Sequence, residues 1–250
     1  MGSTVCAAVA GDPGLELVAA VDPLHAGIDL QQLGVSDTGL QVARTADALA
    51  EAGAEVAVDF TVLDAARENL RWCAANGVHA VVGTTGFSEA DIDDLRARFE
   101  ASAANVLIAP NFAIGAVLMM RFAELAAPYF ETAEVIELHH DEKVDAPSGT
   151  AMLTVARMAE ASSDWGRDPT EKTVVEGARG GEGPGGIRVH SVRLKGLVAH
   201  QEVLLGTTGQ SLSIRHDSYD RTSFMPGVLL AVRSVGDRPG LTLGLDAILS

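Results

Sequence analysis

EVAVDFTVLDAARENLRWCAANGVHAVVGTTGFSEADIDDLRARFEASAANVLIA, residues 55–109, decides the fold class. Three short apolar runs, EVAVDF, HAVV and VLIA, have the composition of strands that are buried on both faces. Between them lie two stretches with helical periodicity, of which the first ends near Asn76–Gly77 and the second covers Ser88–Ala101. Alternating strands and helices predict a parallel, doubly wound sheet with helices on its two faces.

Further elements extend this pattern in both directions. Upstream, Leu15–Val21 predicts another strand, and downstream a helix is expected from about Gly115. The pattern changes after about residue 130, where Ala133–Leu138 predicts a strand and Ser148–Ala161 a helix. The chain therefore leaves the simple strand–helix alternation in its middle part.

The C-terminal part predicts an antiparallel sheet and then a return to the first domain. Residues 176–186, EGARGGEGPGG, contain too much glycine for regular structure and predict a mobile loop. Three closely spaced runs typical of antiparallel strands follow, with a turn signal at residues 206–209. The runs are Ile187–Leu194, Leu197–Leu205 and Ser211–His216, and they are followed by a predicted helix at Thr222–Val235 and a short strand at Leu241–Leu243.

The simplest architecture is an α/β domain interrupted by a second domain. Residues 1–112 and 219–250 are expected to form the parallel sheet, and residues 113–218 an inserted α+β domain with a mixed sheet. Because an open sheet with exposed strands is prone to aggregate, the inserted domain is expected to pair with copies of itself.

Composition narrows the classes of partner and the compartment. The formal net charge of -16 argues against nucleic acid as a partner. No apolar run reaches the roughly 18 residues of a membrane span, and the N-terminus lacks the features of a signal peptide. Two cysteines, Cys6 and Cys73, are too few for a disulfide framework and suit a reducing cytoplasm. Anionic ligands in so acidic a protein would require a locally basic site.

The segment richest in chemical groups is residues 137–151, ELHHDEKVDAPSGTA. His139 and His140 follow a predicted strand, so their side chains should point in opposite directions. Lys143 offers a positive charge for an anionic substrate. Ser148 can cap the next helix, whose first backbone N–H groups, at Gly149 and Thr150, then form an end suited to a carboxylate.

This segment has two other interpretations. The His-His pair beside Asp141 and Glu142 could be a surface metal site, but neighbouring strand histidines diverge and no other ligand pair has the spacing to complete a tetrahedron. No metal is therefore expected. Taken alone, H-H-x-x-K would also fit a solvated loop.

The full run resembles the signature E-x-H-H-x-x-K-x-D-A-P-S-G-T-A of the 4-hydroxy-tetrahydrodipicolinate reductases, long called dihydrodipicolinate reductases. VVGTTGF at Val81–Phe87, IAPNFAIGA at Ile108–Ala116, VDFT at Val58–Thr61 and the run from His216 to Val232 also resemble this family. The resemblance covers essentially the whole chain. It implies a Rossmann-like first domain, a second domain for substrate binding and oligomerisation, and a homotetramer in the cytoplasm. It also implies the reduction of a small cyclic dicarboxylate with NADH or NADPH in the diaminopimelate route to lysine.

The resemblance also implies roles for individual residues. His139 and Lys143 match the catalytic positions, and His140, Ser148, Gly149 and Thr150 match the substrate-binding positions. Positions expected to contact the cofactor are Met1, Gly2, Asp22, Gly83, Thr84, Thr85, Ala109, Pro110, Asn111 and Phe112. Asp22 is expected to accept hydrogen bonds from the adenosine ribose, although it also suits a turn before Pro23.

The chain departs from the family pattern at its beginning. The family opens with a strand and a glycine-rich turn that binds the pyrophosphate, whereas this chain is expected to start at the end of that turn with Met1–Gly2. An alternative function is therefore a truncated, non-catalytic homologue that serves as a ligand-binding or oligomer subunit. Another two-domain nicotinamide oxidoreductase would share the first domain but is not expected to carry the run at residues 137–151.

Overall fold

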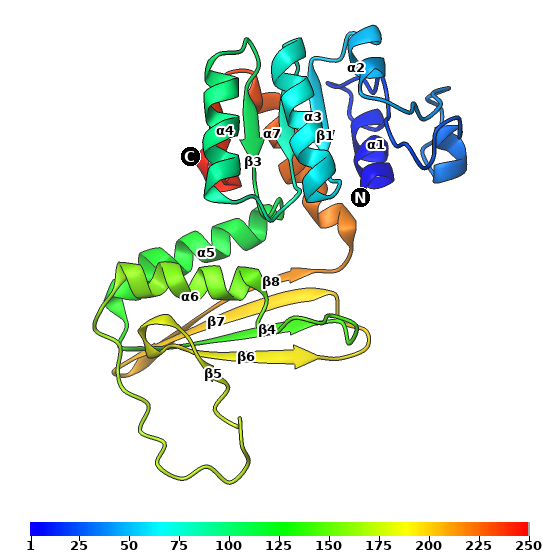
Figure 1. The fold of residues 1–250 in the computed structure, drawn as a ribbon. Helices are drawn as coiled ribbons and strands as arrows, with labels where there is room; N and C mark the ends of the chain where they lie inside the picture. The colour runs from blue at the N-terminus through cyan, green and yellow to red at the C-terminus, as the bar shows by residue number, and fades with distance from the viewer. Residues whose placement is uncertain (250) are drawn as a thin grey trace. The chain divides into compact units, whose positions relative to one another are not determined.

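The chain forms two compact units in the computed structural model, which describes residues 1–249 (Figure 1). The first unit contains residues 1–114 and the chain from Arg221 onward, and the second contains Gly115–Asp220. The boundaries expected from sequence lie two residues before each of these divisions. Each unit is described by itself below.

The first unit is built on a four-stranded parallel sheet with the strand order β1-β2-β3-β9. Its strands are β1 (Val56–Asp59), β2 (His79–Val82), β3 (Val106–Ile108) and β9 (Leu241–Leu243). The register brings the carboxyl ends together, since Asp59 pairs with Val82 and Val82 with Ile108. The short C-terminal strand predicted at residues 241–243 thus returns to the sheet formed by the first half of the chain.

Helices cover both faces of this sheet, which confirms the doubly wound α/β class. Figure 1 shows α3 (Leu63–Asn76) and α4 (Glu89–Glu100) on one face and α7 (Met225–Val235) behind the sheet. α3 and α4 bury Leu70, Cys73, Leu95 and Phe99 against β2 and β3. Val81 points to the opposite face and is also fully buried, because β2 is covered on both sides.

Local sequence signals explain the bounds of these helices. Ser88 and Asp91 form a reciprocal capping box at the start of α4. α3 ends at Gly77, whose φ of +72° is left-handed and is readily adopted by glycine. The predicted helix at residues 222–235 is a 3₁₀ turn, η4 (Arg221–Phe224), followed by α7.

The first 55 residues contain less strand than predicted. They form α1 (Gly2–Ala10), η1 (Leu30–Leu33) and α2 (Asp47–Glu51). The prediction of a strand at Leu15–Val21 is wrong, because this segment makes one isolated bridge, Val21 with Ala43, and a strand needs a partner along its length.

The second unit contains a five-stranded mixed sheet with the order β5-β6-β4-β7-β8. Its strands are β4 (Thr132–His139), β5 (Gly181–Glu182), β6 (Arg188–Arg193), β7 (Ala199–Thr207) and β8 (Gln210–Ser218). β7 and β8 form the antiparallel hairpin that was predicted. The expectation that all three late strands pair antiparallel with one another is wrong, because β4 lies between β6 and β7 and pairs parallel with β6.

The glycine-rich segment is more ordered than predicted. It contains β5 and a 3₁₀ turn, η3 (Pro184–Gly186). A Cβ atom at Gly180 would lie 2.4 Å from the Val189 carbonyl oxygen, and one at Gly183 would lie 3.0 Å from Val155 Cγ1. The glycines therefore permit close packing of the backbone against β6 and α6, and the expectation that this segment has no regular structure is wrong for residues 181–186.

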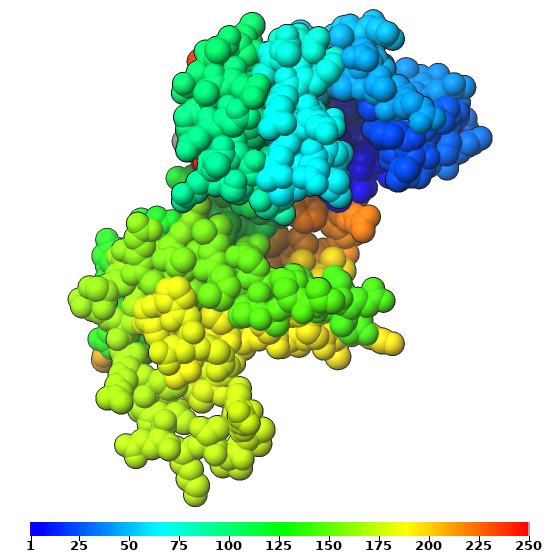
Figure 2. Space-filling model, viewed as in Figure 1, coloured from blue at the N-terminus to red at the C-terminus, as the bar shows by residue number. Residues whose placement is uncertain are grey.

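The remaining helices of the second unit are α5 (Ile114–Ala126), η2 (Ala127–Tyr129) and α6 (Gly149–Ala161). The chain between α6 and β5 extends from the sheet as an arm, which Figures 1 and 2 show in yellow-green. Asp168 holds this arm, because it accepts from the Thr170 backbone N–H and pairs with Arg179 and Arg188.

Candidate active site

The end of β4 carries the histidine that the sequence singled out. Alternation along β4 places Val135, Glu137 and His139 on one face of the sheet. Glu137 is fully buried, and its Oε2 lies 2.5 Å from His139 Nδ1. The His139 side chain is 15% exposed, so the imidazole has one nitrogen bonded to the interior and a ring that reaches the surface.

Arg193 on the neighbouring strand β6 completes this cluster. Its Nη1 donates to Glu137 Oε2 at 2.9 Å and its Nη2 to Glu137 Oε1 at 2.8 Å. β4 and β6 are paired in register with His139 opposite Arg193. The same guanidinium donates to the Asp145 carbonyl oxygen at 2.6 Å, so it also holds the loop that follows β4.

Lys143 lies in that loop and is mostly buried, with 19% of its side chain exposed. Its Nζ donates to Asp145 Oδ1 at 2.6 Å. The loop ends in a cis peptide bond between Ala146 and Pro147, and α6 begins directly afterwards.

The start of α6 lies beside the same glutamate. The Ser148 hydroxyl accepts from the Ala151 backbone N–H, which confirms the predicted cap, and the Ser148 backbone N–H donates to Glu137 Oε1 at 3.3 Å. Gly149 and Thr150 form the first turn of the helix. Glu137, His139 and the N-terminus of α6 are therefore joined, while His140 follows the end of β4 and is exposed.

Burial and charge act in opposite directions on the ionisable groups of this cluster. Burial lowers the pKa of His139 below its ordinary value, as do the charges of Lys143 and Arg193, whereas the bond to Glu137 opposes them. Burial alone would raise the pKa of Glu137, but hydrogen bonds from Arg193, Ser191 and His139 hold that pKa below its ordinary value. The two directions favour an ionised Glu137 beside a neutral His139 at neutral pH.

The first unit holds the predicted cofactor-contacting loops at the carboxyl ends of β2 and β3. Gly83, Thr84 and Thr85 follow β2, and the Thr84 hydroxyl donates to Asp59 Oδ1 at 2.8 Å. Asp59 also accepts from the Thr61 hydroxyl and from Asn69 Nδ2, at 2.8 and 2.7 Å. This buried carboxylate therefore ties the loop after β2 to the end of β1 and to α3.

Aromatic rings and glycines fit tightly at the same edge. Phe60 and Phe112 pack with ring centroids 5.6 Å apart. A Cβ atom at Gly83 would lie 2.1 Å from Phe60 Cε1, and one at Gly227 would lie 2.1 Å from the Phe112 carbonyl oxygen. The other residues of the loop after β3 are Ala109, which is fully buried, Pro110, which is exposed, and Asn111, whose Oδ1 accepts from the Ala113 N–H.

The remaining predicted cofactor positions lie elsewhere in the first unit. Met1 is the N-cap residue of α1, and Gly2 begins this helix. Asp22 Oδ1 accepts from the Leu24 N–H at 2.8 Å, and Oδ2 bonds His25 Nδ1 at 2.9 Å. Asp22 therefore makes these bonds within its own turn.

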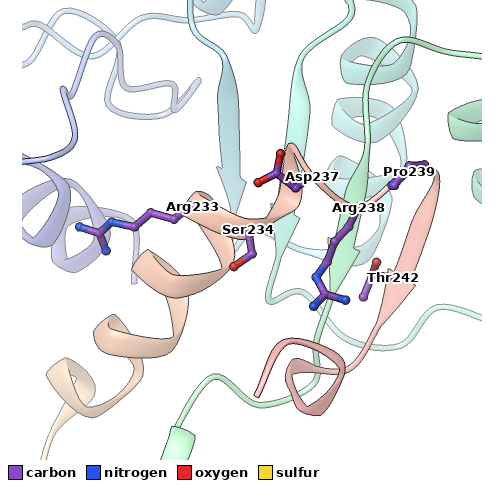
Figure 3. A pocket seen from close by; sticks show the side chains of 6 residues that line it. All are labelled: Arg233, Ser234, Asp237, Arg238, Pro239 and Thr242. Atoms are coloured by element: carbon purple, nitrogen blue, oxygen red, sulfur yellow. The ribbon is translucent and has the colours of Figure 1, made fainter. Parts of the chain in front are cut away.

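Other features of the described chain lie apart from these groups. An open pocket of about 550 Å³ lies at the C-terminal end of α7 and is lined by Arg233, Ser234, Asp237, Arg238, Pro239 and Thr242 (Figure 3). Over residues 1–249, no three His, Cys, Asp or Glu side chains are grouped as a metal site. The helices in this part of the chain are all too short or too polar to cross a bilayer.

Sequence reasoning missed three residues of this arrangement. Glu137 could have been found, because a residue two positions before His139 on a strand shares its face. Asp59 lay inside a noted motif, but its partners are as far as 25 residues away. Arg193 gave no signal, since its position depends on the register between β4 and β6.

Comparison with known proteins identifies the family. Residues 1–112 match the model for the N-terminal part of dihydrodipicolinate reductase, and residues 115–249 match the model for its C-terminal part. The 4-hydroxy-tetrahydrodipicolinate reductase of Nocardia farcinica is 54% identical, with 100% of this chain and 94% of that protein covered. That of Mycolicibacterium vanbaalenii is 53% identical over 90% of this chain and 92% of its own length.

A solved structure agrees with these relatives. The dipicolinate-bound dihydrodipicolinate reductase from Paenisporosarcina sp. TG-14 has a TM-score of 0.87 and 41% identity, and the match covers 99% of this chain and 95% of that one. An amine dehydrogenase from Mycobacterium smegmatis has a TM-score of 0.64 at 15% identity, which shows a shared fold alone. Both domains and nearly the full length are matched, so this chain belongs to the dihydrodipicolinate reductase family.

Proposed function

We propose that the chain reduces 4-hydroxy-tetrahydrodipicolinate with NADH or NADPH in the diaminopimelate route to lysine. Substrate, reduced cofactor and one proton give tetrahydrodipicolinate, oxidised cofactor and water. The observation that carries this proposal is the cluster at the end of β4. There, His139 is bonded to a buried carboxylate that also bonds the start of α6.

His139 is proposed to handle the proton of the reaction. Nδ1 is bonded to Glu137, so Nε2 is the nitrogen available to a substrate. Lys143 is proposed as the second catalytic residue, with a charge that stabilises a carboxylate or developing negative charge.

The start of α6 is proposed to bind a substrate carboxylate. The positive end of the helix dipole favours anions, and Ser148, Gly149 and Thr150 form this end of α6. His140 is proposed to contribute from the exposed side. A cyclic dicarboxylate is also the class of ligand bound in the Paenisporosarcina relative, whose structure contains dipicolinate.

The residues at the carboxyl ends of β2 and β3 fit a nicotinamide cofactor. Ligands of open α/β sheets bind outside this edge, and here Gly83 and Ala109 leave the strand ends without large side chains while Thr85 exposes a hydroxyl. We propose that residues 83–85 and 109–112 contact the cofactor, with Met1, Gly2 and Asp22 near its phosphates and ribose. When bound, the reduced nicotinamide supplies the hydride.

Assembly and location are proposed on separate grounds. The second unit exposes apolar side chains on β7 and β8, since Leu204 and Leu212 are each 37% exposed, and this supports a homotetramer formed through its sheet. Cys6 and Cys73 are both free thiols, which supports a cytoplasmic location.

The proposal is tested by following NADH and NADPH oxidation with enzymatically generated 4-hydroxy-tetrahydrodipicolinate. The wild-type chain is expected to turn over, and His139→Gln to lower kcat by about 100-fold or more because the proton-handling group is lost. Cofactor affinity, measured by nucleotide fluorescence, should change by less than about threefold. Wild-type protein that binds NADH without oxidising it would instead support the non-catalytic alternative.

A further inference from the structure

Glu137 is a buried charge that the proposed chemistry does not itself require. Its side chain is fully buried in the middle of a five-stranded sheet, where an unpaired carboxylate would be strongly unfavourable. It has partners on both oxygens: Arg193 bonds both, His139 bonds Oε2 and the Ser148 N–H bonds Oε1. The chain therefore maintains an ionised carboxylate at this place.

An ionised carboxylate decides which nitrogen of His139 carries the proton. A carboxylate only accepts hydrogen bonds, so across the 2.5 Å contact Nδ1 must be the donor. The neutral imidazole then has its proton on Nδ1 and its lone pair on Nε2. A proton gained or given by His139 therefore passes through Nε2, and Nδ1 stays committed to Glu137.

Arg193 keeps this carboxylate ionised and in place. Each of its two Nη atoms donates a hydrogen bond to one carboxylate oxygen of Glu137. This pair of bonds fixes the plane of the carboxylate and stabilises its negative charge. The bond from Nη2 to the Asp145 carbonyl oxygen extends the same support to the loop that contains Lys143.

We infer that Glu137 and Arg193 are positioning residues that fix the tautomer and orientation of His139, so that Nε2 is the proton-transferring atom. The catalytic meaning of this inference rests on the proposed function. Because the same carboxylate bonds the Ser148 N–H, it also fixes His139 relative to the helix end proposed for the substrate carboxylate.

The chain contains a matched control on the same strand. Glu134 lies on the opposite face of β4, and it also joins an arginine and a histidine: Arg179 Nη2 at 2.6 Å and His190 Nε2 at 2.8 Å. Glu134→Gln removes the same charge from the same kind of cluster, away from His139. Any effect common to both variants reflects the loss of a Glu–Arg pair, and an effect confined to Glu137→Gln reflects positioning of His139.

The direct test is an NMR titration of ¹⁵N-histidine-labelled protein, with His139→Gln used to assign the His139 signals. The wild type and Glu134→Gln should show a neutral His139 with its proton on Nδ1. Glu137→Gln should show a mixture of tautomers and a lower pKa for His139. The charged groups around this ring are Glu137, Lys143 and Arg193, and the removal of Glu137 leaves two positive charges that disfavour the imidazolium.

Kinetics supply the second measurement. Glu137→Gln should lower kcat by about 10- to 100-fold with a smaller change in KM, and Glu134→Gln should change kcat less than about threefold. With His139 donating its proton as the imidazolium, kcat should fall as pH rises through the pKa of His139, and this fall should move to lower pH in Glu137→Gln. Arg193→Lys keeps the positive charge beside Glu137 but not the pair of Nη hydrogen bonds, whereas Arg193→Met loses both. Arg193→Lys should therefore retain a higher kcat than Arg193→Met.

The outcomes separate this inference from the proposed function. The NMR titration needs neither cofactor nor substrate. A wild type that fails to reduce the substrate would therefore overturn the proposed function, but the tautomer of His139 in the wild type and in Glu137→Gln would still test whether Glu137 positions this ring. Unchanged His139 tautomer and pKa in Glu137→Gln would overturn the inference, as would equal losses of kcat in the Glu137→Gln and Glu134→Gln variants.

Discussion

At the scale of single residues, Gly83 is a position where the edge of the first sheet tolerates little change. A Cβ atom there would lie 2.1 Å from Phe60 Cε1 and 2.5 Å from Cδ1 and Cζ, so the ring must move. Gly83→Ala is therefore expected to destabilise the fold by about 1–3 kcal/mol, the usual cost of overpacking. It should also weaken NADH binding, because the ring of Phe60 is packed against Phe112 in the proposed cofactor loop. Denaturant unfolding and NADH fluorescence titration measure the two effects.

Gly227 provides a contrast at the same edge. Its missing Cβ would meet the Phe112 carbonyl oxygen at 2.1 Å, which is backbone and cannot be removed by substitution. Phe60→Leu should restore part of the stability and NADH affinity to Gly83→Ala, whereas the same change should not help Gly227→Ala. An unaltered NADH affinity in Gly83→Ala would exclude a role for this packing in cofactor binding.

Residue-scale prediction from sequence succeeded where the cause was local. Ser148 caps α6 because its hydroxyl accepts a hydrogen bond from a backbone N–H only three residues later. Gly77 ends α3 because glycine readily adopts the left-handed backbone conformation of a helix end. Arg193 could not be predicted, since it meets Glu137 across 56 residues of chain. The roles of His139 and the other site residues remain proposals.

At the scale of elements, Asp59 holds two strand ends and a helix together. Its Oδ1 accepts from the Thr84 hydroxyl, and from the hydroxyl and backbone N–H of Thr61, while Oδ2 accepts from Asn69 Nδ2. Asp59→Asn replaces one acceptor with a donor, so at least one of these donors loses its partner. We expect a loss of about 1–3 kcal/mol in unfolding free energy and weaker NADH binding, because the loop after β2 is released.

Asp64 is the matched control for this prediction. It lies in the first turn of α3 and pairs with Arg67, but its side chain is 90% exposed. Asp64→Asn should change the unfolding free energy by less than about 0.5 kcal/mol, since exposed ion pairs contribute little. If both variants bind NADH like the wild type, the Asp59 cluster stabilises the sheet alone and does not organise the cofactor loop.

Element prediction failed where a partner strand was decisive. Periodicity predicts that Ile187–Leu194 is extended, and β6 is indeed formed there. Periodicity does not say which strand lies beside it, and β4, whose residues lie 54 positions before their partners, pairs parallel with β6. Leu15–Val21 has a strand-like composition but forms one bridge, because extended structure is stabilised by its neighbours.

At the scale of the whole molecule, the excess of acidic residues opposes the approach of an anionic cofactor. The formal net charge is -16, and the basic residues of the candidate site are paired, Lys143 with Asp145 and Arg193 with Glu137. At about 10 mM salt the Debye length is about 30 Å and the charge of the entire protein acts on the ligand, whereas at about 150 mM it is about 8 Å and only nearby groups act.

The association rate of NADH is therefore expected to rise severalfold over this range, as measured by stopped-flow fluorescence. NADPH, with an additional phosphate, should show a steeper rise, and reduced nicotinamide riboside, which lacks the phosphates, should show almost none. An association rate that falls with salt for both dinucleotides would mean that local attraction by basic residues outweighs the net charge, because screening then removes attraction and not repulsion.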